Sequence, residues 1–277
     1  MQTLGPRIEL CQAAAAQLTQ YLQTLSAEAW CHPSACEAWE VRDVVGHLIV
    51  CAEAYAAAIA RGLQGDTAPL VDVPPPGDPN RAAVIAQRSI ARRERLGDQL
   101  LATFTARHHH LHDLMRSLRP QDWETPCVYP GADLRPAHQF LIAWLTELTM
   151  HAWDIQSALD PTVLLFPDSL PVLLERLPGV VARAVRLETR LHAPRCYRFA
   201  LTDAVPSQYD IVLADEAVRM ESEGTRAVHV RCQCDTGTFV LLMYGRLTPQ
   251  TALASGRLVV ESTRDPMTPF STWFKFA

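Results

Sequence analysis

Residues 147–159 have the sequence ELTMHAWDIQSAL, and this stretch decides the fold of the first half of the chain. It is the second part of a helix that is predicted from about Pro136 to Leu159 and that ends before Asp160-Pro161. Glu147 and His151 are four residues apart, so both side chains project from one helix face, one turn apart. Such a pair can hold a metal ion, although many Glu–His pairs at this spacing are simply hydrogen-bonded on a helix surface.

Three more helices are predicted before this stretch, because apolar residues recur at steps of three and four. Segments rich in proline, at residues 69–79 and 120–131, are expected to be extended connections. The three predicted helices cover residues 7–25, 41–63 and 81–118. Four helices with two such connections indicate an all-α four-helix bundle over residues 1–162.

The second half, residues 163–277, has a different pattern and predicts a smaller α+β domain. Short segments rich in Val, Leu, Tyr and Phe alternate there with turn residues, as strands do. The expected strands are Tyr197–Leu201, Tyr209–Leu213, Ala217–Met220, Ala227–Cys232, Thr238–Tyr244 and Arg257–Glu261. The expected helices cover residues 170–187 and 249–255.

The composition excludes several classes of protein. The 277 residues are 48% hydrophobic, which is enough for a core in each domain, and the net charge of −5 offers nucleic acid no basic surface. No run of about 18 apolar residues lacks a charge, so no membrane-spanning segment is expected. No secretory signal is visible, so we expect a cytoplasmic protein whose eight cysteines are reduced.

His47 is the third candidate metal ligand. It stands in the apolar surroundings Val44-Val45-Gly46-His47-Leu48-Ile49 on the second predicted helix. A lone histidine on an apolar face is usually a hydrogen-bonded core residue, so spacing alone leaves both possibilities open. If His47, Glu147 and His151 converge, they would hold a divalent ion, most suitably zinc, and leave one position open, as in catalytic sites.

Two motifs resemble the thiol-dependent maleylpyruvate isomerase branch of the DinB-like superfamily. Residues 36–48, CEAWEVRDVVGHL, resemble the pattern C-x-G-W-T-V-R-D-V-V-x-H-L, which carries a metal histidine in that family. Residues 147–159 resemble its E-x-x-x-H-x-W-D-I-x-x-A-L helix. Further along, residues 238–246 and 252–261 look like the sterol-carrier-like domain that often follows the bundle in this branch.

The resemblance implies a metal- and thiol-dependent enzyme in which His47, Glu147 and His151 hold Zn²⁺ or another divalent metal. The cofactor would be a low-molecular-weight thiol such as mycothiol or ergothioneine, and the reaction would convert maleylpyruvate, or a similar cis-enoic acid, to its trans isomer, fumarylpyruvate. The alternatives are a thiol S-transferase, a non-catalytic ligand-binding protein and, last, a redox protein that uses Cys232 and Cys234. The sequence does not choose between a monomer and a homodimer.

An anionic substrate of this kind needs arginines near the metal. Arg246, in the Gly-Arg that closes a predicted strand, is preferred, although it can equally be an ordinary surface arginine. Trp153 is expected to pack the core or to line the cofactor pocket, and Asp154 to support a ligand histidine. The other arginines considered are Arg231, Arg257 and Arg264.

The first motif departs from the family pattern at two positions, where Ala38 replaces a glycine and Glu40 replaces a threonine. Glu40 can still favour the positive end of the helix, so we expect an adjusted turn rather than a lost helix. Arg42 and Asp43 are expected to form a local pair or cap.

A second group of histidines consists of the run at residues 108–110 together with His112. Consecutive histidines on a helix point in different directions and seldom bind one ion together. We expect these four to form a solvated helix face.

Overall fold

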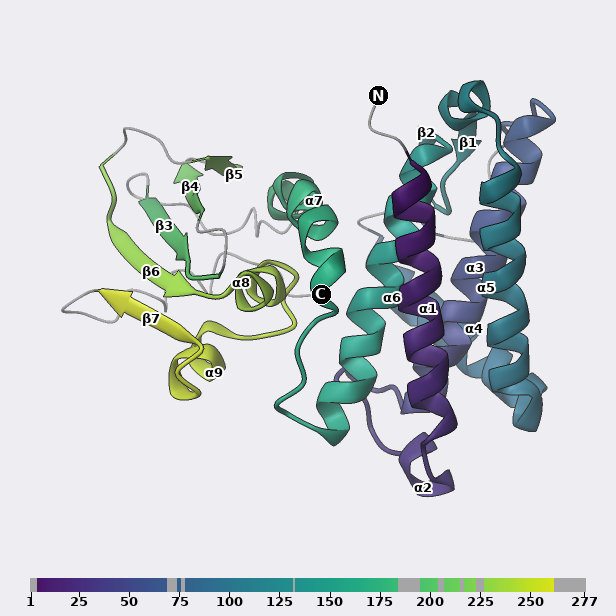
Figure 1. Cartoon of the computed structure of the whole chain (residues 1–277), viewed down its shortest axis with the longest axis horizontal. Helices are drawn as coiled ribbons and strands as arrows, with labels where there is room; N and C mark the ends of the chain where they lie inside the picture. The colour runs from purple at the N-terminus through teal and green to yellow at the C-terminus, as the bar shows by residue number, and fades with distance from the viewer. Residues whose placement is uncertain are drawn as a thin grey trace. The chain divides into compact units, whose positions relative to one another are not determined.

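The computed structural model describes residues 4–68, 74–75, 78–131, 133–183, 195–203, 207–214, 217–222 and 227–261. The chain divides into two compact units, Met1–Phe166 and Pro167–Ala277 (Figure 1). The first unit is helical and the second combines a sheet with helices, which confirms the predicted fold classes. The sequence placed the boundary four residues earlier, after residue 162.

Four long helices form the bundle of the first unit, and each packs against two of the others. Large side chains such as Phe104, Phe140 and Trp144 are almost completely buried between them. This burial of apolar surface is what holds the bundle together. The bundle helices are α1 (Gly5–Gln23), α3 (Val41–Leu63), α5 (Leu100–Ser117) and α6 (His138–Leu159).

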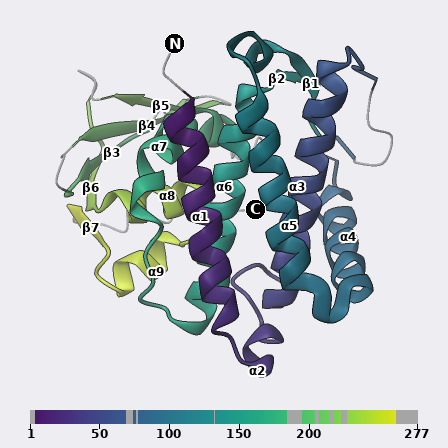
Figure 2. The ribbon, with the colours of Figure 1, turned by 45° about the vertical axis from the view of Figure 1, so that its right-hand side comes forward.

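The single helix predicted for residues 81–118 is wrong, because the chain breaks at Gly97. Gly97 has φ +50°, and one 3₁₀ turn, η1 (Gly97–Gln99), separates α4 (Arg81–Leu96) from α5. An isolated glycine is often tolerated inside a helical pattern, so the sequence did not mark the break. After the break, α5 belongs to the bundle while α4 packs on the outside of α3 (Figure 2).

Helix α4 approaches α3 closely at Gly46. A Cβ atom at Gly46 would lie 2.6 Å from the carbonyl oxygen of Ser89, so only glycine fits this crossing. The Arg93 guanidinium donates from Nε to Asp43 Oδ1 at 2.8 Å and ties the same two helices. These contacts fix α4 beside the turn of α3 that carries His47.

Helix α3 begins after a turn in which Ala38 has a backbone conformation that favours glycine. Ala38 has φ +64°, and it is the one non-glycine residue with positive φ in the part of the chain that the structure describes. Asp43 caps the helix, since its Oδ2 accepts from the Glu40 N–H at 3.0 Å. Arg42 pairs with Glu40 rather than with Asp43, so the expected cap is present and the expected pair is not.

By length and composition, α3 could also cross a membrane. However, 67% of its most apolar window is buried, as in the core helix of a soluble protein.

The second connection, expected to be irregular, contains a short antiparallel hairpin. The hairpin lies so close to α3 that a Cβ atom at Gly62 would approach Cys127 Sγ to 2.5 Å. Three-residue strands are too short to show an alternating pattern in the sequence. The short elements of this unit are α2 (Ala27–Trp30), η2 (Pro120–Glu124), β1 (Pro126–Val128) and β2 (Leu134–Pro136).

A five-stranded sheet forms the centre of the second unit, with the strand order β5-β4-β3-β6-β7. Strands β3 and β6 are parallel, and the other neighbours are antiparallel. The strands are β3 (Arg195–Leu201), β4 (Gln208–Ala214), β5 (Ala217–Ser222), β6 (Val230–Cys234) and β7 (Leu258–Glu261). The helices are η3 (Pro167–Ser169), α7 (Leu170–Arg183), α8 (Thr236–Met243) and α9 (Pro249–Ala254). Positions beyond 183 in the predicted helix 170–187 lie outside the described residues.

The strand predicted at Thr238–Tyr244 is wrong, because this segment is helix α8. Asp235 caps the helix, accepting at Oδ1 from the Thr238 N–H at 2.7 Å. The apolar residues of α8 are buried on all sides, with the Phe239 ring 5.0 Å from that of Phe199. A short continuous apolar run suits a buried helix and a buried strand equally well, and only the capping aspartate distinguishes them here.

Candidate metal centre

Helices α3 and α6 bring the three predicted metal ligands together in the first unit. The Nε2 atom of His47 lies 3.2 Å from Glu147 Oε2, and the Nε2 atom of His151 lies 3.3 Å from the same oxygen. The two imidazole rings are 4.7 Å apart between centroids. Both ring nitrogens therefore face the same carboxylate oxygen, although His47 stands 100 positions before Glu147 in the chain.

The other ring nitrogen of His151 is held by Asp154. The distance from His151 Nδ1 to Asp154 Oδ2 is 2.8 Å, and Asp154 is fully buried. This hydrogen bond fixes the ring and directs Nε2 towards Glu147, as a carboxylate beside a metal-binding histidine does. The Trp39 ring packs beside both histidines, and its centroid lies 5.0 Å from that of His47 and 6.2 Å from that of His151.

The electrostatics of the site favour a positive charge between its carboxylates. Burial alone would raise the pKa of Glu147, but hydrogen bonds with His151 and His47 hold it well below its usual range. Burial alone would lower the pKa of His151, but its contacts with Asp154, Cys36 and Glu147 raise it well above its usual range. Burial lowers the pKa of His47, which stays neutral. A neutral imidazole and an ionised carboxylate are the forms that bind a metal.

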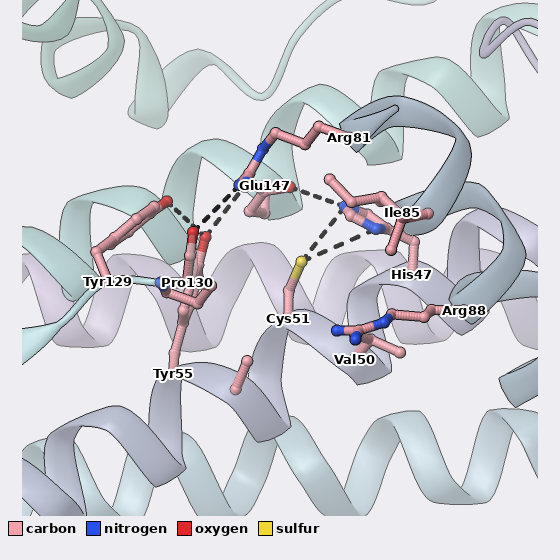
Figure 3. Close-up of a pocket in the computed structure, with 12 residues that line it drawn as sticks. His47, Val50, Cys51, Tyr55, Arg81, Ile85, Arg88, Tyr129, Pro130 and Glu147 are labelled. Carbon is pink, nitrogen blue, oxygen red and sulfur yellow. Dashed lines mark hydrogen bonds and ion pairs between the residues drawn. The ribbon is translucent and has the colours of Figure 1, made fainter. Parts of the chain in front are cut away.

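A cavity of about 150 Å³ opens beside His47 and Glu147 (Figure 3). Its wall is mainly apolar, but Arg81 and Arg88 of α4 also reach it. The Tyr55 hydroxyl lies 2.9 Å from that of Tyr129 and donates to Glu147 Oε1 at 3.5 Å. The cavity is lined by His47, Val50, Cys51, Ala54, Tyr55, Arg81, Val84, Ile85, Arg88, Tyr129, Pro130 and Glu147.

The other residues chosen from the sequence lie elsewhere. Trp153 is buried and is not among the residues that line this cavity. Arg246 belongs to the second unit, where it follows α8 rather than a strand and its N–H donates to the Leu241 carbonyl at 2.9 Å. The role of Trp153 in the cofactor pocket and that of Arg246 in binding substrate stay predictions. Of the alternatives, Arg257 donates from Nε to Thr238 Oγ1, and Arg264 lies outside the described residues.

The histidine group on α5 is only partly solvated, so this prediction was wrong in part. His109 and His110 are exposed, whereas His108 and His112 are buried. None of the eight cysteines, all of which lie among the described residues, is in a disulfide. Cys232 and Cys234 are buried in β6, and burial raises the pKa of Cys232 to about 12, which does not suit a reactive thiol.

Sequence reasoning missed the part of the site that α4 supplies, together with Cys51 and Tyr129. Arg81 is the first residue of α4 and Arg88 lies about two turns further on, and nothing in their spacing indicated that this helix would cover His47. Cys51 had a signal, because it follows His47 by four residues and must lie on the same helix face.

The residues of the site fit the divalent metal that the motifs imply. His47, Glu147 and His151 provide the nitrogen and oxygen donors that zinc accepts. Asp154 provides the outer hydrogen bond that such a histidine needs. The half-buried Glu147 and the buried Asp154 carboxylates also call for a cation.

Comparison with known proteins finds a family for each part of the chain. A family model described as the mycothiol maleylpyruvate isomerase N-terminal domain matches residues 11–156, and a model of the SCP-2 sterol transfer family matches residues 182–262. No curated protein matches the chain.

Two solved structures share the fold of the whole chain. The crystal structure of the mycothiol-dependent maleylpyruvate isomerase has a TM-score of 0.65 at 15% identity, and the match covers 95% of both chains. A variant of that enzyme with one histidine replaced by alanine gives the same values. The first family model spans more than half of the chain. The chain therefore belongs to the mycothiol maleylpyruvate isomerase N-terminal domain family, and an SCP-2 sterol transfer domain follows the matched region.

Proposed function

We propose that the protein is a metal-dependent enzyme that uses a low-molecular-weight thiol to isomerise maleylpyruvate or a similar cis-enoic acid. The observation that carries the proposal is the convergence of His47, Glu147 and His151 at the edge of a cavity that two arginines also line. Membership of the family supports the thiol as cofactor, with mycothiol as the first choice and ergothioneine as the second.

The three ligands would hold Zn²⁺ or another divalent metal. When bound, such a metal lowers the pKa of a coordinated thiol, so that a thiolate is present at neutral pH. The non-catalytic alternative is disfavoured, because it would have His47 and Glu147 far apart and they are 3.2 Å apart.

The protein's own residues prepare the cavity for a small dianion. Arg81 and Arg88 place guanidinium groups at its wall, and guanidinium groups bind carboxylates in a bidentate manner. Arg81 is positioned by the Pro74 and Pro130 carbonyls, to which it donates. The apolar wall excludes water, which strengthens these charge interactions. Arg246 stays a further proposed substrate contact from the second unit.

The experiment that tests this function loads the full chain with zinc and mixes it with maleylpyruvate and a panel of small thiols, including mycothiol and ergothioneine. We expect the trans product to form with one thiol and not with the others. Absence of isomerisation with every thiol, together with transfer of a thiol to an electrophile, would make the protein an S-transferase instead.

The matched variants are His47→Ala and His151→Ala, with the exposed His110→Ala as control. We expect the first two to lose both zinc and activity while the control keeps about one equivalent of zinc. Full zinc retention in both ligand variants would contradict the proposed metal centre.

A further inference from the structure

Among the described residues that line the cavity, Cys51 is the one His, Cys, Asp or Glu side chain that the proposed function does not use. It follows His47 by four residues on α3, just as His151 follows Glu147 by four residues on α6. Each helix therefore presents two potential ligands one turn apart on one face. Cys51 and His47 of α3 and Glu147 of α6 lie close enough to share one ion.

Three pairs of these atoms have the separations of ligand atoms around one metal ion, and Cys51 takes part in one of them. Cys51 Sγ lies 3.3 Å from His47 Nε2, which is the nitrogen that also faces Glu147 (Figure 3). Ligand atoms of Cys51, His47 and Glu147 all lie within 4.8 Å of one another. A tetrahedral zinc site with bonds of about 2.0 to 2.3 Å separates its ligand atoms by roughly 3.3 to 3.8 Å. The separations measured here are 3.2 and 3.3 Å.

The charge of the site favours the same conclusion. The carboxylates of Glu147 and Asp154 would balance a divalent ion, and the guanidinium groups of Arg81 and Arg88 in the mainly apolar cavity wall leave the site with excess positive charge. A thiolate from Cys51 would reduce that excess, and net charge is costly in apolar surroundings.

Cys36 is the other thiol near the site, but it faces a different atom. Its Sγ donates to Asp154 Oδ2 at 3.0 Å and lies 3.7 Å from His151 Nδ1. These contacts place Cys36 on the far side of the His151 ring from Nε2, which faces Glu147. Cys36 therefore serves as a matched control for Cys51.

We propose that Cys51 is the fourth protein ligand of the metal in the absence of a small thiol, and that an incoming thiol takes its position. In the exchange, the bond between the metal and Cys51 Sγ breaks, a bond to the incoming sulfur forms, and the proton of the incoming thiol passes to Cys51. The inference rests on the metal centre of the proposed function and adds a residue that competes with the cofactor.

X-ray absorption at the zinc edge tests this in the zinc-loaded full chain, kept reduced by a phosphine so that no thiol is added. We expect one Zn–S distance of about 2.3 Å in the unmodified protein and in Cys36→Ala. We expect its loss in Cys51→Ala, with zinc still bound and helix content unchanged by circular dichroism.

The outcomes separate the two proposals. Zinc bound with nitrogen and oxygen neighbours alone, and lost in His47→Ala, would overturn the role of Cys51 and leave the metal centre standing. A sulfur neighbour that disappears in Cys36→Ala instead would also overturn it. Failure of the unmodified chain to bind zinc would overturn the metal centre itself.

The replacement of Cys51 by an incoming thiol is tested separately. The small thiol 2-mercaptoethanol is titrated into the cobalt-substituted protein, and binding is followed in the visible spectrum. Because Cys51→Ala leaves the position open, it should bind the probe at least about tenfold more tightly than the unmodified protein. Equal affinity in the two proteins would overturn the competition.

Discussion

At the scale of single residues, His151 lies between two carboxylates, and this determines which of its nitrogens can meet a metal. Asp154 holds Nδ1 at 2.8 Å, so Nε2 faces Glu147 at 3.3 Å. Neighbouring residues also support the loop in front of the site, because the Ala35 N–H donates to the Asp154 carbonyl at 2.9 Å. The same loop places the Trp39 ring beside both histidines.

Replacing Asp154 with asparagine should weaken zinc binding by about 10- to 100-fold, because outer hydrogen bonds to ligand histidines contribute that much to metal affinity. Competition with a chromophoric chelator measures the effect. Asp113→Asn, at an 80% exposed side chain on α5, is the control and should bind zinc normally. Equal affinity in Asp154→Asn would show that the hydrogen bond does not support the ligand.

Ala38→Gly should stabilise the protein by roughly 1 kcal/mol, because Ala38 has φ +64° and a Cβ atom is disfavoured in that region. Urea unfolding followed by tryptophan fluorescence gives the free energy of unfolding. Ala35→Gly, in the same loop but without a positive φ, should be neutral or destabilising. A loss of stability in Ala38→Gly would contradict the argument from strain.

Because of the buried His108, the protein should lose stability in mild acid. Burial, then the neighbouring His109 and His112, lowers its pKa from 6.5 to about 4. The folded state therefore binds the proton less well than the unfolded state, so the stabilisation is complete above pH 6.5 and is lost as the pH falls towards 4. Unfolding free energies measured across this range should fall less steeply in His108→Met. The exposed His110→Met should keep the slope of the unmodified protein.

At the scale of elements, the site depends on how closely α4 packs against α3. The break at Gly97 lets α4 turn away from α5, and Gly46 leaves room for the Ser89 carbonyl. The Asp43–Arg93 pair holds the crossing at 2.8 Å. As a result, Arg81 and Arg88 reach the cavity beside His47.

Gly46→Ala should destabilise the protein by about 1 to 3 kcal/mol, because the new methyl group would meet backbone rather than a movable side chain. Zinc binding should weaken as well, since His47 is the next residue. Gly5→Ala, where no heavy atom lies within 4 Å, is the control. A Gly46→Ala protein as stable as the control would show that α4 can shift without cost.

At the scale of the whole molecule, the two units are built on different principles. The first has its potential ligands on separate helices of one bundle, so a bound metal would tie α3 to α6. The second has a sheet whose β3 and β4 share a buried pair, with Arg198 Nε 2.7 Å from Asp210 Oδ1. A metal should therefore stabilise the first unit.

Removal of the metal should lower the stability of the first unit. Binding at 100 times the dissociation constant adds about 2.7 kcal/mol to the free energy of unfolding. Five of the six tryptophans lie between residues 30 and 153, so tryptophan fluorescence reports mainly on this unit. A chelator should lower the thermal midpoint of the unmodified protein and leave that of His47→Ala unchanged. An equal shift in both would assign the stabilising metal to another site.

The sequence by itself determined the helical bundle, the α+β half and the pairing of Glu147 with His151, because all three follow from local periodicity along one chain segment. It also identified His47 through its flanking motif. The break at Gly97 and helix α8 were missed, since a lone glycine and a short apolar run are each compatible with two local structures.

Only the tertiary structure decided which residues surround the ligands. Arg81, Arg88 and Tyr129 reach the cavity because α4 and the segment between β1 and β2 lie beside α3. Cys51 is a candidate ligand because its sulfur lies 3.3 Å from His47 Nε2. Contacts between distant segments depend on packing geometry, such as the close approach at Gly46, which the order of residues along one helix does not contain.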